Sequence, residues 1–165
     1  LGYTDVVVEG TKIFGTVPFP LLGIHRANQT YAYQLQSYNL MNFLEFVSDQ
    51  YASINIDHSF NGFFFNKIPL LRKLKWREAI TLKVLYGSVS NKNNPTYNSE
   101  LLKFPVMPDG TPITYTLESK PYVEGSVAIA NIFKFFRIDL VKRFTYTNHP
   151  NISELGLRAR FKFDF

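Results

Sequence analysis

The last twelve residues of the chain alternate strictly between apolar and polar side chains. Every second residue from position 155 is apolar, and the residues between are charged or glycine; the apolar series is Leu155, Leu157, Ala159, Phe161, Phe163 and Phe165. A period of two places the two series on opposite faces of a β-strand. Soluble strands usually have about 5–6 residues, whereas about twelve tilted residues cross the hydrocarbon core of a bilayer. The pattern predicts a long amphipathic strand of membrane-crossing length.

Five earlier segments show the same alternation less strictly. The predicted strands are 4–14, 51–65, 76–89, 122–133, 138–147 and 154–165. The connections 16–50 and 90–121 exceed the ~12–15 residues usual for a structureless loop, whereas 66–75 and 134–137 are short. Long loops at one end and short turns at the other are typical of a transmembrane β-barrel, whose long loops are extracellular. We therefore expect both long loops outside the cell.

Composition removes several other classes of protein. Aromatic residues make up 16% of the chain and charged residues 19%, a combination that excludes intrinsic disorder. No run approaches the ~18–20 apolar residues of a membrane-spanning helix. Cysteine is absent, which excludes disulfides, thiolate metal sites and a cysteine nucleophile. The net charge of +5 is scattered rather than clustered, so no nucleic-acid partner is expected.

The predicted fold class is all-β, an antiparallel transmembrane β-barrel. Six strands fall short of the usual minimum of about eight, because unpaired edges are costly in lipid. We therefore expect residues 1–165 to be the C-terminal six strands of one larger barrel domain, with earlier strands before Leu1. The alternative is a soluble six-stranded barrel.

The polar faces of these strands carry charges of both signs. We expect them to face the barrel lumen; they are Arg77, Lys83, Glu124, Asp139, Arg143, Arg158, Arg160 and Lys162. The simpler interpretation of these charges is a solvated lumen wall. The more specific interpretation is a network of charged side chains that holds a plug or an inserted loop. Aromatic residues at strand ends suit the two membrane interfaces; they are Tyr51, Trp76, Tyr86, Tyr122 and Tyr146.

The terminal strand ends on an aromatic residue. Phe161, Phe163 and Phe165, with apolar residues at every second position before them, resemble the β-signal that the barrel assembly machinery recognises. We expect all three to face lipid.

A helix is predicted inside the first long loop. Apolar residues at 40, 41, 44 and 47 follow helical spacing, and Asn39 is a suitable N-cap for a helix over 39–47. The alternative is an irregular loop packed by its own aromatic side chains.

Catalytic patterns are weak. Asp57, His58 and Ser59 include the residue types of a hydrolase triad, but neighbours on a strand point to opposite faces. His25, His58 and His149 lie in separate segments without the spacing of metal ligands. We therefore expect no enzyme, cofactor or metal, and we interpret His58 as an interface residue.

Several blocks of sequence resemble a family of Bacteroidetes outer-membrane proteins. They are residues 63–78 (FFFNKIPLLRKLKWRE), 37–42 (SYNLMN), 131–134 (NIFK) and the closing RFKFDF. Family members look like a carboxypeptidase-like regulatory domain followed by a barrel of unknown function. That barrel is similar to the surface-antigen superfamily, which includes the sixteen-stranded outer-membrane insertases. The Arg-Gly loop motif of the insertases is replaced here by Gln36-Ser37-Tyr38-Asn39.

The expected function is a non-enzymatic role in outer-membrane assembly, secretion or transport. The expected location is the bacterial outer membrane, with membrane lipid, the barrel assembly machinery and other outer-membrane or periplasmic proteins as partners. Alternatives are a receptor or porin-type channel and, more remotely, an outer-membrane hydrolase or a soluble lipocalin-like barrel.

Overall fold

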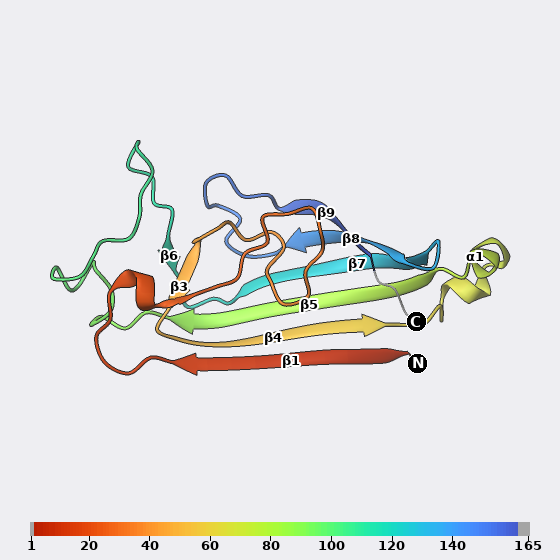
Figure 1. Ribbon diagram of the computed structural model, residues 1–165, viewed down its shortest axis with the longest axis horizontal. Coiled ribbons are helices and arrows are strands. Elements are labelled where there is room, and N and C mark those ends of the chain that lie inside the picture. The colour runs from red at the N-terminus through yellow and green to blue at the C-terminus, as the bar shows by residue number, and fades with distance from the viewer. Residues whose placement is uncertain (1, 162–165) are drawn as a thin grey trace.

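The chain folds around one long six-stranded antiparallel sheet (Figure 1). A computed structural model describes residues 2–161. The strands, in spatial order, are β1 (Tyr3–Lys12), β4 (Gln50–Ser59), β5 (Arg77–Ser88), β7 (Tyr122–Ile132), β8 (Phe136–Arg143) and β9 (Leu155–Phe161). The fold is all-β, as the sequence predicts, and each long strand overlaps one predicted segment.

The register of the sheet gives it two chemically different faces. Ile54 lies opposite Val84, and Ile56 lies opposite Leu82, so apolar rows continue from strand to strand. We call this the exposed face, because its side chains reach solvent. Its large exposed members are Val6, Val8, Ile80, Leu82, Val127, Ile138, Leu140, Leu155, Leu157 and Phe161.

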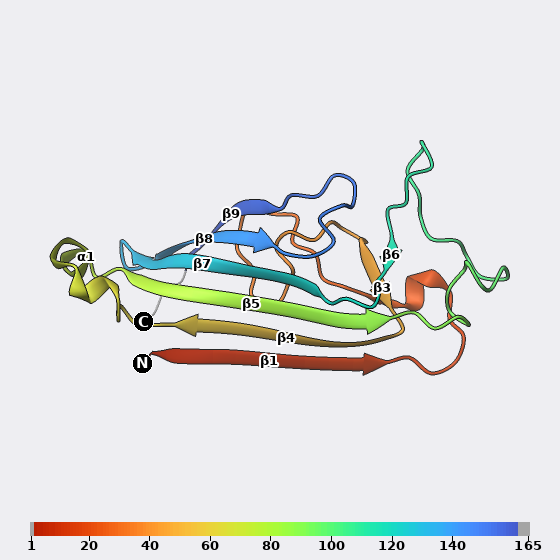
Figure 2. The same cartoon turned by 180° about the vertical axis from the view of Figure 1, so that it is seen from behind.

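The opposite face is polar and is covered by the chain itself. Residues 25–45, which we call the inserted segment, lie over β5, β7 and β8 on this side (Figures 1 and 2). We call this side the covered face. A soluble sheet normally buries its apolar face and exposes its polar face, so this arrangement is inverted.

The sheet is open across the described residues. β1 and β9 form its two edges, and no strand pairing joins them. Residues 2–161 therefore do not form a closed barrel by themselves, and the larger transmembrane barrel stays a prediction. At one point the inserted segment covers the β9 edge, where Tyr33 N donates to Ala159 O at 2.8 Å and Ala159 N donates to Tyr31 O at 3.0 Å.

Long and short connections occupy opposite ends of the sheet (Figure 1). The long-loop end carries a second, small sheet and the 3-10 helix η1 (Phe19–Leu21); its strands are β2 (Gly23–Ile24), β3 (Phe46–Ser48) and β6 (Tyr115–Thr116). The short-turn end carries the 3-10 helix η2 (Phe65–Lys67) and the helix α1 (Pro69–Leu74) between β4 and β5. The register of β7 with β8 shifts between Ile129 and Ile132, where Asn131 adopts a positive φ of 62°.

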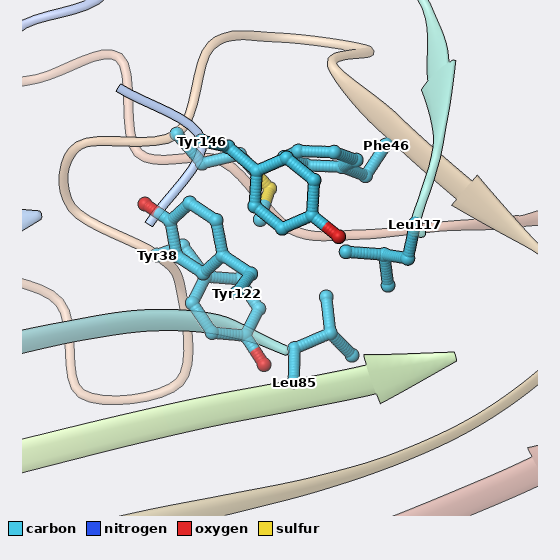
Figure 3. Packing of buried hydrophobic residues seen from close by; sticks show 7 residues of the cluster. Tyr38, Phe46, Leu85, Leu117, Tyr122 and Tyr146 are labelled. Carbon is cyan, nitrogen blue, oxygen red and sulfur yellow. The ribbon is translucent and has the colours of Figure 1, made fainter. Parts of the chain in front are cut away.

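The apolar core lies between the covered face and the loops, near the long-loop end. Figure 3 shows aromatic rings of this cluster meeting edge to face. Ring centroids are 5.2 Å apart for Tyr38 and Tyr122 and 4.9 Å apart for Phe46 and Tyr146. Both contacts join residues distant in sequence, so these rings fix the loops to the sheet.

The helix predicted over 39–47 is wrong. The segment is irregular up to β3, and Leu44 has a positive φ of 60°. The Glu124 carboxylate accepts hydrogen bonds from Asn39 N at 2.7 Å and Leu40 N at 3.1 Å. Leu40 and Met41 are buried against the sheet rather than along one helix face. Tertiary hydrogen bonds and packing therefore override the helical spacing.

Within residues 2–161, no helix is long and apolar enough to cross a membrane.

Candidate functional site

A row of charges crosses the covered face. Lys83 on β5 lies opposite Glu124 on β7, which lies opposite Arg143 on β8. Each of the three has an exposed fraction of 1%. Alternating signs on adjacent strands make each charge the counter-ion of its neighbour, which offsets the cost of burial.

The Lys83–Glu124 part of the row holds the backbone of the inserted segment. The ammonium of Lys83 donates to Gln34 O at 2.7 Å and to Ser37 O, and it lies 3.8 Å from Glu124 Oε1. Glu124 accepts the Asn39 and Leu40 N–H groups described above and the Tyr122 hydroxyl at 3.0 Å. Backbone groups that would otherwise be buried without partners are thereby satisfied.

Arg143 connects the same segment to β8 through an acid in the loop. Its guanidinium donates from Nη1 to Glu45 Oε2 at 2.9 Å and from Nη2 to Glu45 Oε1 at 2.5 Å. Further donations reach the carbonyls of Leu40, Thr145 and Tyr146. His149 Nδ1 lies 2.8 Å from Glu45 Oε1. All five guanidinium donors of Arg143 are used, so it is a rigid attachment point.

A second cluster lies nearer the short-turn end. Arg137 donates from Nη1 to Asp57 Oδ2 at 3.0 Å and from Nη2 to Asp139 Oδ1 at 2.7 Å. Thr81 Oγ1 accepts from the same guanidinium at 3.1 Å, and Ser126 Oγ donates to Asp139 Oδ1 at 3.1 Å. One buried arginine thus joins acids from β4 and β8.

Three cations surround one aromatic ring of the inserted segment. The Tyr33 ring centroid lies 5.1 Å from Lys83 Nζ, 5.2 Å from Arg137 Cζ and 5.7 Å from Arg160 Cζ. Burial raises the pKa of the Tyr33 phenol to about 12. Tyr33 therefore joins the two charge clusters as a neutral side chain.

The inserted segment also has internal hydrogen bonds. Asn28 Nδ2 donates to Asn39 Oδ1 at 2.8 Å and to Ala32 O at 2.6 Å, and Asn39 Nδ2 donates to Gln34 O at 3.0 Å. A cavity of about 290 Å³ beside these amides is lined by Thr30, Asn42, Arg158 and neighbouring residues.

The predicted lumen charges fall into three groups. Lys83, Glu124, Asp139 and Arg143 lie buried on the covered face. Arg158 and Arg160 lie on the same face of β9, half-buried, where Arg158 Nη2 donates to Asn39 O at 2.7 Å and Arg160 Nη2 lies 3.6 Å from Asp57 Oδ2. Arg77 has the same strand parity but is exposed at the start of β5. Lys162 lies outside the described residues, as do Phe163 and Phe165.

Sequence reasoning missed Arg137, Asp57 and Glu45 as members of the network. Arg137 was expected in the turn 134–137, whereas β8 begins at Phe136. Asp57 lies on the polar side of the predicted strand 51–65, so the alternation along that strand could have identified this residue. Glu45 lies in a loop, where no periodicity gives side-chain direction.

The aromatic residues expected at membrane interfaces require correction. Tyr122 and Tyr146 are buried in the core cluster, where both rings pack with Phe46. Tyr51 also lies on the covered side, with its ring 4.8 Å from that of His25. Tyr86 lies exposed on the opposite face, and Trp76 lies half-buried just before β5.

The Asp57-His58-Ser59 sequence does not form a triad. Asp57 and Ser59 lie on the covered face, whereas His58 Nδ1 lies 2.7 Å from Thr4 Oγ1 on the other face. Among residues 2–161, no group of three or more His, Cys, Asp or Glu side chains could hold a metal ion.

Phe161, the one residue of the predicted β-signal within residues 2–161, is exposed on the apolar face.

These observations define a class of protein: an all-β chain with an exposed apolar sheet face and a polar face occupied by its own loop. Residues 18–97 match a family model described as "Family of unknown function (DUF5686) C-terminal domain". Over those residues the chain is similar to that C-terminal domain, including the inserted segment, β4 and β5. No curated protein and no solved structure matches the chain.

Proposed function

We propose that this chain forms six consecutive strands of a transmembrane β-barrel in the bacterial outer membrane. Its role is non-enzymatic, in outer-membrane assembly, secretion or transport. Membrane lipid and the barrel assembly machinery are the proposed partners.

The observation that carries the proposal is the inverted sheet. Val127 and Leu157 on the apolar face are 59% and 63% exposed, while Asp139 on the polar face is 0% exposed. In water this arrangement leaves a continuous apolar surface without a partner, and in a bilayer that surface contacts lipid. β5 and β7, at 12 and 11 residues, have the length that crosses the hydrocarbon core.

The open edges support a larger barrel. β1 and β9 leave backbone groups unpaired by strands, and such groups cost several kcal/mol each in lipid. Further strands must therefore pair with both edges in a bilayer, and a barrel of sixteen strands fits the resemblance described above.

A ligand-receptor function is the second candidate. The polar cavity beside Arg158 and the Asn28–Asn39 pair offers amide, hydroxyl and guanidinium groups at one place. Such a group of donors and acceptors suits a polar solute.

The test of the proposal is the behaviour of the full-length protein during extraction and electrophoresis. A membrane barrel requires detergent for extraction and migrates differently on a gel before and after boiling. A chain that is fully soluble without detergent would exclude the membrane barrel and favour the soluble alternative.

A further inference from the structure

The exposed face is hollowed at the short-turn end of the sheet. A cavity of about 660 Å³ lies there, with Phe60, Phe64 and Phe65 on one side and Ile80, Ile129 and Leu140 on the other. The first three come from the connection between β4 and β5, and the others come from β5, β7 and β8. We call it the apolar groove. Its lining is almost wholly hydrocarbon, which suits an acyl chain.

The aromatic wall of the groove is fixed to the sheet. Phe64 N donates a hydrogen bond of 2.5 Å to Glu78 Oε1, and the Phe60 and Phe64 ring centroids are 5.3 Å apart. The groove therefore has a formed wall.

The connection beside the groove is rich in cations. It carries four basic residues, Lys67, Arg72, Lys73 and Lys75. None of the four has a carboxylate partner within residues 2–161. Lys67 Nζ lies 4.3 Å from the Phe63 ring centroid and 5.9 Å from that of Phe64, a groove residue. This cluster is a surface for an anion.

The helix beside the groove is amphipathic. Leu70 and Leu74, one turn apart on α1, are exposed, and Arg72 and Lys73 lie between them in sequence. A short segment with apolar and basic sides is typical of chain lying at the boundary between lipid headgroups and acyl chains. Figure 1 shows this connection projecting beyond the sheet at the end opposite the long loops.

We propose that the apolar groove and its cations bind an anionic glycerophospholipid. One acyl chain lies in the groove, and the phosphate contacts Lys67 and its basic neighbours. The inference rests on the proposed membrane location, because a lipid reaches the groove only when the exposed face is in a bilayer.

The headgroup rather than the acyl chain supplies the selectivity. An acyl chain that moves from the bilayer into the groove leaves one apolar surrounding for another, so the transfer gains little free energy. Each basic residue near an anionic headgroup favours binding by an amount that corresponds to about fivefold in affinity. Removal of the cations should therefore abolish the lipid preference without abolishing membrane insertion.

Trp76 provides a local reporter, since it lies two residues before Glu78. The full-length protein is reconstituted in phosphatidylcholine vesicles containing brominated phosphatidylglycerol or brominated phosphatidylcholine, and quenching of tryptophan fluorescence is measured. Subtraction of the signal of the Trp76→Phe variant isolates Trp76. We expect phosphatidylglycerol to be preferred by at least about fivefold, the contribution of a single basic residue.

A matched pair of variants tests the cause of this preference. The first is the triple variant Lys67→Gln/Arg72→Gln/Lys75→Gln. It should abolish the preference, so that the two lipids bind about equally. Lys12→Gln/Lys92→Gln/Lys103→Gln removes the same charge outside the connection and should leave it unchanged. Equal loss in both variants would overturn the inference, because net charge alone would then explain the preference.

Two outcomes separate the inference from the proposed function. Equal quenching of wild-type Trp76 by the two brominated lipids would overturn the lipid site and leave the membrane barrel standing. Quenching by neither lipid would show that this end of the exposed face lies outside the bilayer and would overturn the lipid site, while the barrel is judged by the detergent and gel-mobility test.

Discussion

At the scale of single residues, burial of charge on the covered face depends on complete pairing. Arg137 contacts Asp57 and Asp139 at once, with three of its nitrogens donating. Removing the shared cation leaves two carboxylates in a buried site, with only Arg160 still close, 3.6 Å from Asp57. The cost of such a loss exceeds the worth of the original pair, because most of the compensation for desolvated charge is gone.

We predict that Arg137→Gln destabilises the protein by about 3–5 kcal/mol. The measurement is the urea midpoint of the protein refolded in detergent micelles. The triple variant Arg137→Gln/Asp57→Asn/Asp139→Asn removes both acids as well and should recover most of that loss. A single variant that loses less than about 1 kcal/mol would contradict the compensation argument.

His25 gives the inserted segment a pH dependence. Burial lowers the pKa of His25 from 6.5 to about 4, and its Nε2 lies 2.9 Å from Ser48 Oγ. The charged residues that line the same cavity, Glu9 and Arg26, form an ion pair with each other at 3.7 Å. Neutral His25 therefore stabilises the folded segment fully above pH 6.5, and this contribution is lost as the pH falls from 6.5 toward 4.

We predict that the segment 25–45 is about 2 kcal/mol less stable at pH 5 than at pH 7.5. Hydrogen exchange of its backbone amides, corrected for intrinsic rates, measures the difference. His25→Gln should remove the pH dependence. Equal exchange protection of the wild type at both pH values would be incompatible with a neutral buried His25.

At the scale of elements, the exposed face of the strands distinguishes a membrane from water. We predict that Leu82→Arg costs about 2–4 kcal/mol in a bilayer, because Leu82 lies exposed in the middle of β5. Folding yield into lipid vesicles and the urea midpoint measure the cost. The control Asn98→Arg, in a loop, should change neither the folding yield nor the urea midpoint. If Leu82→Arg also changed neither quantity, the result would favour a soluble sheet.

The connections give a prediction of orientation. Residues 89–121 join β5 to β7 at the long-loop end, opposite α1. We predict that an epitope tag inserted after Asn94 is accessible on intact cells, because long barrel loops are extracellular. Accessibility only after the outer membrane is permeabilised would reverse the topology.

The elements differ in how far the sequence could predict them. The strands follow from alternation, because the parity of a strand determines the face of each side chain. Parity thus located Lys83, Glu124, Asp139 and Arg143 on one face. It could not locate Glu45 or Asn39, whose contacts with Arg143 and Glu124 join residues 98 and 85 positions apart. The predicted helix over 39–47 failed for the same reason, since Glu45 is bound by Arg143 and Leu40 packs against Val141, both distant in sequence.

At the scale of the whole molecule, the inserted segment and the polar face act as one unit. Lys83, Glu124 and Arg143 bind backbone or side chains of residues 34–45, so the segment occupies the side of the sheet that would face a barrel lumen. In the proposed barrel the segment is a plug. Its removal would transfer a row of charges from protein contacts to water, which solvates them well.

We predict that replacing residues 29–44 with a short Gly-Ser linker opens an ion-conducting pore in the full-length barrel. The strands should still insert, because the lipid-facing residues are unchanged, while the lumen charges become hydrated. Single-channel recording in planar bilayers should show steady conductance for the linker variant and little for the wild type. Heat-modifiable gel mobility serves as the control that the variant folds. A folded variant that conducts no more than the wild type would mean that this segment is not what closes the lumen.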